Sequence, residues 1–327
     1  MSAPETSTVK LHCIAWTLLL GLAASAQASD YPAKPIRLIV GYSPSGAGDG
    51  IARIVAEAMG RELGQGIVVD NKPGAGSTLA STLLSRAPAD GYTIGLATGT
   101  LYGIDQHLYG VRYTPADFTP INRLTVSPLV LAVSPKSGIT QLKDLVATAR
   151  ARPGQLNYAS SGIGGSPHLA ALTFERAIEA TMVHIPFKGG APALQAVATG
   201  EVDLSFGTAA SVLPLGRQGV VKMLGVTTQQ PSAVAPGVPT LDSQGLPGFE
   251  FSFWFGLFGP ARLPPELHAR LVAASNKVLA DPQVQEKLLS TGNEAAPFKS
   301  VAEFGAWAAG AGKAQLERVK NANVKVE

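Results

Sequence analysis

The chain has 327 residues, of which 46% are hydrophobic and 15% charged, and this is enough apolar material for the cores of two domains. Its 26 basic and 23 acidic side chains leave a formal net charge of only +3. Because these charges are scattered, and no basic stripe is interleaved with aromatic residues, the sequence argues against a nucleic-acid-binding protein.

Residues 1–28 have the three parts of a cleavable signal peptide. Lys10 precedes the apolar stretch Ile14–Ala24, which is too short to span a bilayer, and the small residues Ala26-Gln27-Ala28 follow it. We expect cleavage after Ala28, export to the periplasm and no membrane insertion of the mature chain; a buried N-terminal helix is the alternative. The single cysteine, Cys13, lies in this segment, so no disulfide is expected in the mature chain.

Strand and helix patterns alternate after the signal segment. The continuous apolar run Ile36–Val40 is typical of a strand covered on both faces. Asp49 is a suitable cap for the following helix, whose apolar stripe ends before Gly64. The same unit recurs as strand, helix and strand: Ile67–Val69, a helix from about Ser77, and Tyr92–Ala97. Such a series predicts a mostly parallel sheet flanked by helices.

A second series of this kind begins with the apolar run Leu129–Val133. Its further predicted elements are a helix from near Thr140, the strand Leu156–Ala159, a helix with Ser166 as N-cap and Pro167 at its first position, the strand Met182–Ile185, the helix Pro192–Thr199 and the strand Val202–Phe206. After the apolar run Phe255–Phe258 the pattern is only helical: Glu266–Leu279, Val284–Leu289 and a helix opened by the capping box of Ser300 and Glu303. We therefore predict an α/β fold in which residues 29–127 and 255–327 form one domain, 128–254 form an inserted second domain, and a ligand crevice lies between them.

Two glycine-rich turns, Gly41–Asp49 and Asn71–Ser77, each follow a predicted strand and open a predicted helix. Turns of this build direct backbone N–H groups and the positive end of a helix toward a shared crevice, which favours a bound anion. Neither turn contains a catalytic group. The sequence also lacks a Walker loop, a dinucleotide fingerprint and the usual zinc and calcium motifs, so we expect no cofactor and no metal.

Seven segments stand in a characteristic order and spacing: Ile36-Arg37-Leu38-Ile39-Val40 with Pro44-Ser45-Gly46-Ala47-Gly48-Asp49, Asn71-Lys72-Pro73-Gly74-Ala75-Gly76, Pro88-Ala89-Asp90-Gly91-Tyr92-Thr93, Tyr158-Ala159-Ser160-Ser161-Gly162, Pro186-Phe187-Lys188-Gly189, and Gly200-Glu201-Val202-Asp203. Together they resemble the receptor family of tripartite tricarboxylate transporters, also called Bug or TctC-like solute-binding proteins. The resemblance spans nearly the whole mature chain. Ser45 departs from the family's first turn, which has a glycine at this position, so the identity of the ligand is not transferred from any relative.

The resemblance implies a type II-like periplasmic binding protein of two α/β domains, which closes on a small carboxylate and presents it to the membrane components of a tripartite transporter. Ligands in the family include di- and tricarboxylates, acidic amino acids and aromatic acids. Backbone N–H and hydroxyl groups can hold a carboxylate without an arginine. The candidate ligand-binding residues are Tyr42, Ser43, Ser45, Gly46, Ser77 and the run Thr98–Thr100 in the first domain, and Ser160, Ser161, Gly162, Ser166, His168, Lys188, Gly189 and Thr208 in the second.

Several residues also have a structural interpretation. Asp49 fits a helix cap better than a ligand contact. Lys188 suits either a solvated loop or an anion-binding turn, and His168 suits either an exposed position or a carboxylate contact. Ordinary structural roles are predicted for His107, His184 and His268, and core packing rather than a ligand-facing wall for Phe251, Phe253, Trp254 and Phe255.

Two other functions stay open at the level of sequence. A secreted serine hydrolase would use Ser43, Ser161 or Ser166 as nucleophile and His168 as base, but the turns around Ser43 and Ser166 lack the last glycine of a nucleophile elbow. A carboxylate-sensing receptor that serves signalling needs the same closing crevice as one that serves uptake. We therefore predict a binding protein and not an enzyme.

Overall fold

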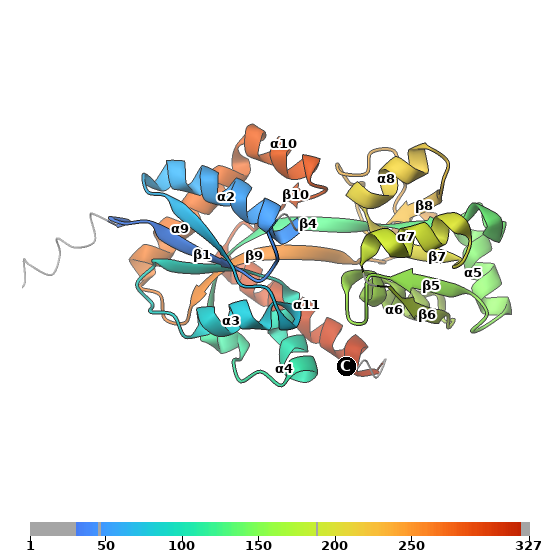
Figure 1. Ribbon diagram of the computed structural model, residues 1–327, viewed down its shortest axis with the longest axis horizontal. Helices are drawn as coiled ribbons and strands as arrows, with labels where there is room; N and C mark the ends of the chain where they lie inside the picture. The colour runs from blue at the N-terminus through green and yellow to red at the C-terminus, as the bar shows by residue number, and fades with distance from the viewer. Residues whose placement is uncertain (1–30, 45–46, 188, 322–327) are drawn as a thin grey trace, which may run out of the picture.

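The computed structural model describes residues 31–44, 47–187 and 189–321. The predicted signal peptide and the predicted site residues Ser45, Gly46 and Lys188 lie outside these ranges. The described chain forms two lobes joined by two long strands (Figure 1). Within these ranges, no helix combines the length and the apolar character that a membrane crossing requires.

The first lobe is built on three parallel strands. β1 (Ile36–Val40) lies between β2 (Ile67–Asn71) and β3 (Thr93–Ala97) and pairs with both in parallel. Helices cover both faces of this unit, with α2, α9 and α10 on one side and α3, α4 and α11 on the other (Figure 1). Their bounds are α2 (Ala47–Leu63), α3 (Thr78–Ser85), α4 (Ile104–Tyr109), α9 (Pro265–Ala280), α10 (Pro282–Ser290) and α11 (Val301–Asn321). Because both faces are covered, β1 is an unbroken apolar run.

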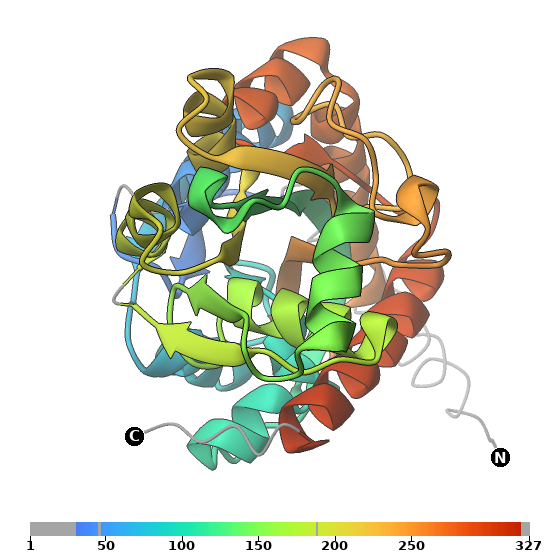
Figure 2. The same ribbon diagram turned by 90° about the vertical axis from the view of Figure 1, so that its right-hand side faces the viewer.

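The second lobe repeats this plan. β5 (Asn157–Ser160) pairs in parallel with β6 (Val183–Pro186) and with β7 (Leu204–Thr208). Its other elements are α5 (Leu142–Ala151), α6 (Ser166–Ile178), α7 (Gly190–Thr199), α8 (Ala209–Arg217) and β8 (Lys222–Val226). Figure 2 views this lobe end on, with helices on both sides of its strands.

β4 (Phe118–Val133) joins the sheets of the two lobes, because its first part pairs antiparallel with β9 (Ser252–Pro260) and its last part with β7 and β8. β9 also pairs with β3 of the first lobe. The strand order is β2-β1-β3-β9-β4-β7-β5-β6, and β8 and the short β10 (Glu294–Ala295) also pair with β4. β4 begins well before the predicted run Leu129–Val133, because prolines and alternating polar residues obscure its first half. The predicted domain boundaries fall inside β4 and β9, and the division into domains stays a prediction.

Three predictions about individual elements were wrong. Asp49 is not the cap of α2 but lies in its first turn, where its carboxylate accepts hydrogen bonds from Arg53 Nε and Asn71 Nδ2, each at 2.9 Å. Ser166 is the first residue of α6, and Gly165 occupies the cap position. The C-terminal segment is also not only helical, because β10 adds a short strand to β4.

An aromatic cluster anchors the long C-terminal helix α11 to β9. Phe304 is fully buried and contacts Trp254, Phe258 and Phe298, with ring centroids 5.6–5.8 Å apart. Arg123 of β4 lies over the ring of Phe298, 4.2 Å from its centroid. Farther along α11, Val319 packs into the core of the second lobe. This helix therefore touches both lobes.

Phe304→Ala is expected to lower the free energy of unfolding by about 3–5 kcal/mol, because it leaves a cavity among rings that cannot collapse fully. Urea unfolding followed by far-UV circular dichroism measures this loss. The matched variant Phe298→Ala, at a partly buried position of the same cluster, should cost clearly less. Equal losses for both variants would contradict the central role of Phe304.

Candidate ligand-binding site

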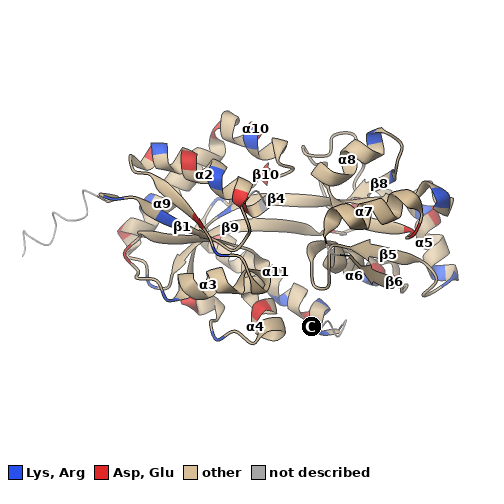
Figure 3. Ribbon diagram, in the orientation of Figure 1, with Lys and Arg blue, Asp and Glu red and all other residues tan. Residues whose placement is uncertain are grey.

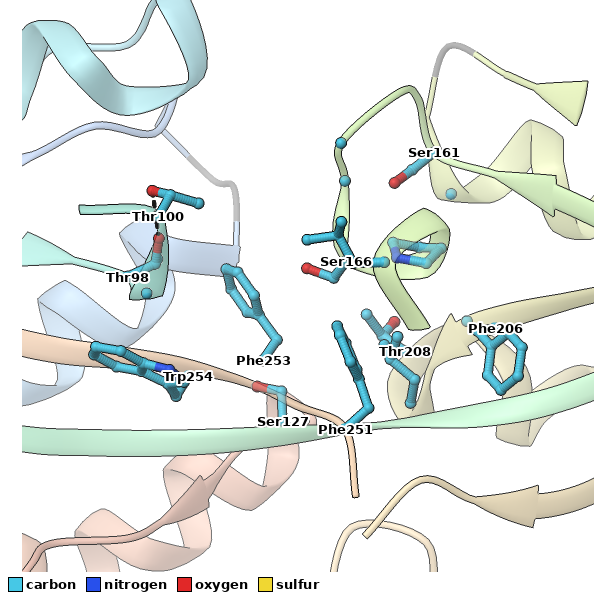
Figure 4. A pocket seen from close by; sticks show the side chains of 18 of the residues that line it. Thr98, Thr100, Ser127, Ser161, Ser166, Phe206, Thr208, Phe251, Phe253 and Trp254 are labelled. Atoms are coloured by element: carbon cyan, nitrogen blue, oxygen red, sulfur yellow. Dashed lines mark hydrogen bonds between the residues drawn. The ribbon is translucent and has the colours of Figure 1, made fainter. Parts of the chain in front are cut away.

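A cavity of about 720 Å³ lies between the two lobes and is lined by both of them and by β4 and β9. Figure 4 shows Thr98 and Thr100 on the first-lobe side and Ser161, Ser166 and Thr208 on the opposite side, with aromatic rings between them. The cavity thus combines two polar walls with an apolar floor.

The second lobe presents three helix starts to this cavity. β5, β6 and β7 are parallel, so the helices that follow them begin at the same edge of the sheet. The lining includes Ser166 at the start of α6, Gly190 at the start of α7, and Ala210 in the first turn of α8. Each helix start carries backbone N–H groups without an intrahelical acceptor and the positive end of the helix dipole. Together they form an environment that favours an anion.

The first lobe contributes a strained turn before α3. Gly74, Ala75, Gly76 and Ser77 all have positive φ angles, of 133°, 44°, 62° and 77°. Gly76 and Ser77 line the cavity. A Cβ on Gly76 would stand 2.5 Å from the Tyr109 hydroxyl, so this position requires glycine. Backbone strain of this kind is found at functional sites, where the surrounding structure holds it.

Two stacked histidines support the loop between β5 and α6. The rings of His168 and His184 are 4.0 Å apart and nearly parallel. His168 Nδ1 accepts a hydrogen bond from the Gly164 backbone N–H at 3.0 Å, and His184 Nε2 lies 2.6 Å from Ser160 Oγ. Burial lowers the pKa of His168 to about 4, with a smaller effect from His184, whose own pKa burial also lowers.

These positions agree with one prediction from the sequence and correct another. His184 has a structural role, as predicted, because it forms part of this support. His168 is neither exposed nor part of the cavity lining; it is buried behind the loop, where it accepts the hydrogen bond from Gly164.

The structure brings eight predicted residues to the cavity: Tyr42, Ser77, Thr98, Gly99, Thr100, Ser161, Ser166 and Thr208. Ser43 is exposed elsewhere, and Ser160 is buried behind the loop. Gly162 and Gly189 flank the lining without entering it, whereas Gly190 does enter. Contact between any of these residues and a ligand stays a prediction.

The hydroxyl groups in the lining differ in whether they already have a hydrogen-bond partner within the protein. Ser161 and Ser166 have no side-chain hydrogen bond to another described residue, so both can donate to a ligand. Ser77 Oγ already donates to the Gly41 carbonyl at 3.0 Å. Thr98 Oγ1 and Thr100 Oγ1 are 3.1 Å apart, and burial raises the pKa of Tyr42 to about 12, which keeps its phenol protonated.

Sequence reasoning missed the aromatic floor. Phe251, Phe253, Trp254 and Phe255 all line the cavity, although Phe251, Trp254 and Phe255 are also buried against the protein. The prediction of core packing was therefore incomplete, because the same side chains form the cavity wall. The aromatic run was visible in the sequence, but its position between the lobes depends on the pairing of β9 with β4.

Charge is almost absent from the described lining of the cavity. Among its described lining residues Asp105 is the one ionisable carboxylate, and there is no lysine or arginine. The basic residues that Figure 3 colours, which do not include Lys188, lie away from the starts of α6, α7 and α8. Among the described lining residues, helix starts and hydroxyl groups are thus the groups suited to attract an anion.

The histidine pair predicts a dependence of stability on pH. Below about pH 6.5 the unfolded chain binds a proton at His168, whereas the folded chain does so only near pH 4, so the free energy of unfolding should fall as the pH drops through this window. In His168→Asn, which removes the titrating ring and keeps an acceptor for Gly164, urea unfolding from pH 7.5 to pH 4 should show a flatter slope. Exposed His107→Asn is the control and should keep the wild-type slope. Equal slopes of the free energy of unfolding against pH for wild type and His168→Asn would refute the assignment of this pH dependence to His168.

A family model and a known relative both match most of this chain. The family model described as tripartite tricarboxylate transporter family receptor matches residues 51–303. A UPF0065 protein in the tcbD-tcbE intergenic region of a Pseudomonas species is 37% identical over 269 residues, which cover 80% of this chain and 79% of the relative.

Two solved structures from Rhodopseudomonas palustris, each 28% identical, have the same fold. The first, described with adipate, has a TM-score of 0.74 and covers 90% of this chain and 99% of its own. The second is MatC with bound malate, with a TM-score of 0.71 over 88% of this chain and 100% of its own. The match of the family model over most of the chain shows that this protein belongs to the receptor family of tripartite tricarboxylate transporters.

Proposed function

We propose that this protein is a periplasmic solute-binding receptor whose two lobes close on a small carboxylate and deliver it to the membrane components of a tripartite tricarboxylate-type transporter. The observation that carries the proposal is the convergence of α3, α6, α7 and α8, which all begin at one cavity without a cation among its described lining residues. Export would follow from cleavage after Ala28.

The physical argument rests on neutral donors. One helix start stabilises a nearby anion by typically 0.3–1 kcal/mol, and more where the geometry is partly buried. Hydroxyl groups such as those of Ser161 and Ser166 add hydrogen bonds to the charged oxygen atoms. The rings of Phe251 and Phe253 lie between the polar walls and can cover the carbon skeleton of the ligand. A small organic acid has both a carboxylate for the polar donors and a carbon skeleton for the aromatic rings.

The relatives support the same class of ligand. One structural relative is described with adipate and the other with malate, and both compounds are dicarboxylates. The family description names a transporter receptor. The two relatives therefore support the proposal of a carboxylate ligand. The family description supports the proposal that this chain delivers its ligand to a transporter.

A serine hydrolase fits the geometry poorly. Neither Ser161 nor Ser166 has a hydrogen bond to a histidine in the described structure. His168 Nδ1 is occupied by the Gly164 N–H, and the serine that contacts a histidine, Ser160, is buried outside the cavity lining. The protein is a receptor of its family and not an enzyme.

The mature protein should be stabilised by at least one acid in a thermal-shift panel of mono-, di- and tricarboxylates, aromatic acids and amino acids. A ligand at a hundredfold excess over its dissociation constant adds about 2.7 kcal/mol to the free energy of unfolding. The matching amide, in which every carboxylate is replaced, should lose most of the shift, since it carries no charge for the helix starts to stabilise. Equal stabilisation by acid and amide would exclude a carboxylate site.

Ser161→Ala and Ser166→Ala should each weaken carboxylate binding by about 1.5–3 kcal/mol, the contribution of one hydrogen bond to a charged group. Isothermal titration calorimetry with the best acid of the panel measures the change. Ser43→Ala is the matched control, because Ser43 is exposed and outside the cavity lining. The melting temperatures without ligand should agree among all variants. Unchanged binding in both cavity variants would show that these hydroxyl groups do not contact the ligand.

A further inference from the structure

The long helix α11 packs inward along one stripe of residues. The buried members of the stripe are Phe304, Ala308, Gly312 and Val319, whose spacing places them on one face of the helix. Gln315 occupies the remaining position of this face, one turn after Gly312 and one turn before Val319. It is the one polar residue among these five, at a position where the helix otherwise has apolar residues or glycine.

Gln315 lies where this stripe passes from one lobe to the other. Phe304 and Ala308 pack in the aromatic cluster of the first lobe, whereas Val319 packs in the core of the second. Figure 1 shows α11 running from the first lobe toward the second. Between these two anchors, Gln315 lines the cavity. Its side chain therefore meets the cavity instead of a packed core.

The carboxamide of Gln315 lies against the turn Gly99–Tyr102. A Cβ placed on Gly99 would stand 3.1 Å from Gln315 Oε1, and a Cβ placed on Gly312 would stand 3.4 Å from the Gly99 carbonyl oxygen. The glycine at position 312 thus lets α11 approach this turn closely. Because Gly99 follows β3 and also lines the cavity, the carboxamide belongs to the first-lobe wall.

The same carboxamide has no hydrogen bond to another residue of the described structure. Its oxygen and nitrogen atoms are not fully buried, so both keep accessible surface. The neighbouring hydroxyl groups of Thr98 and Thr100 bind each other, with 3.1 Å between their oxygen atoms. A carboxamide has two donor hydrogens and one acceptor oxygen, and here these groups can bind a molecule in the cavity.

The starts of α6, α7 and α8, which favour one carboxylate, belong to the second-lobe wall of the same cavity. Resting on the proposed function, we propose that Gln315 is a specificity-determining residue, which donates a hydrogen bond from Nε2 to a second oxygen-bearing group of the bound acid. Such a group is a second carboxylate, a hydroxyl or a carbonyl. All three accept a hydrogen bond from an amide N–H, whereas an alkyl group does not.

Two pairs of acids test this contact, because the members of each pair share one carboxylate and the number of carbon atoms: adipate with hexanoate, and succinate with butyrate. We expect the wild type to bind the diacid of at least one pair about tenfold or more tightly than its monoacid, as measured by calorimetry. Gln315→Met keeps the length of the side chain and removes its N–H and carbonyl groups. This variant should lose most of the preference, because it weakens the diacid and leaves the monoacid unchanged.

Gln315→Glu places a negative charge at the same position. It should weaken the diacid more than Gln315→Met does, because the second carboxylate of the diacid would face a like charge without a cation in the described lining. The matched control Ala314→Glu adds the same charge at an exposed position of α11 outside the cavity lining, and should keep the wild-type affinity. Melting temperatures without ligand confirm that each variant is folded.

The remaining outcomes separate this contact from the proposed function. The contact is overturned if the wild type prefers neither diacid, if Gln315→Met weakens diacid and monoacid equally or not at all, or if Ala314→Glu weakens the diacid as much as Gln315→Glu does. Failure of all four acids, while another acid of the wider panel binds, also overturns it and leaves the carboxylate proposal standing. If no carboxylate of any kind stabilises the protein, the proposed function itself fails, and the contact fails with it.

Discussion

In each lobe the strands that lead into the cavity run parallel, and a parallel strand pair can be connected only by a crossover that returns to the same end. The segments that follow these strands therefore begin at one edge of each sheet. β4 holds the two edges opposite each other, because it continues from one sheet into the other. The helix starts, the strained turn before α3 and the hydroxyl groups of the lining all owe their positions to this arrangement.

Much of this arrangement can be predicted from the sequence, because buried parallel strands appear as unbroken apolar runs. The strand β1, for example, has the predicted limits Ile36–Val40. Residues at or just after the carboxyl ends of such strands, such as Thr208 and Ser161, could be assigned to the crevice for the same reason. The rest depends on contacts between distant segments. Ser160 and His184 meet across neighbouring strands, and an aromatic side chain such as Phe253 has the same sequence signature in a core and in a cavity wall.

If the proposed function holds, helix starts and hydroxyl groups in place of cations would suit a receptor that must release its ligand. A lysine side chain would lose about 2 kcal/mol of rotamer entropy on fixing its charge, and burying the charge would add a desolvation cost. Backbone N–H groups are already fixed by the helices that carry them. In a nearly neutral cavity, a single charged group has a large effect on the electrostatic potential that a ligand meets. In the described lining, the one such group is the carboxyl group of Asp105.

The course of β4 and β9 has a consequence for the order in which the chain folds. Pro128 pairs with Ser252, and every strand and helix particular to the second lobe lies between these two residues. β3 also pairs with β9, so the first lobe cannot complete its sheet until the chain has passed through the second lobe. Closing so long a loop carries an entropy cost that shrinks when the intervening residues are already compact. The edge of β3 that pairs with β9 therefore stays unpaired until the chain between Pro128 and Ser252 has been closed into a loop.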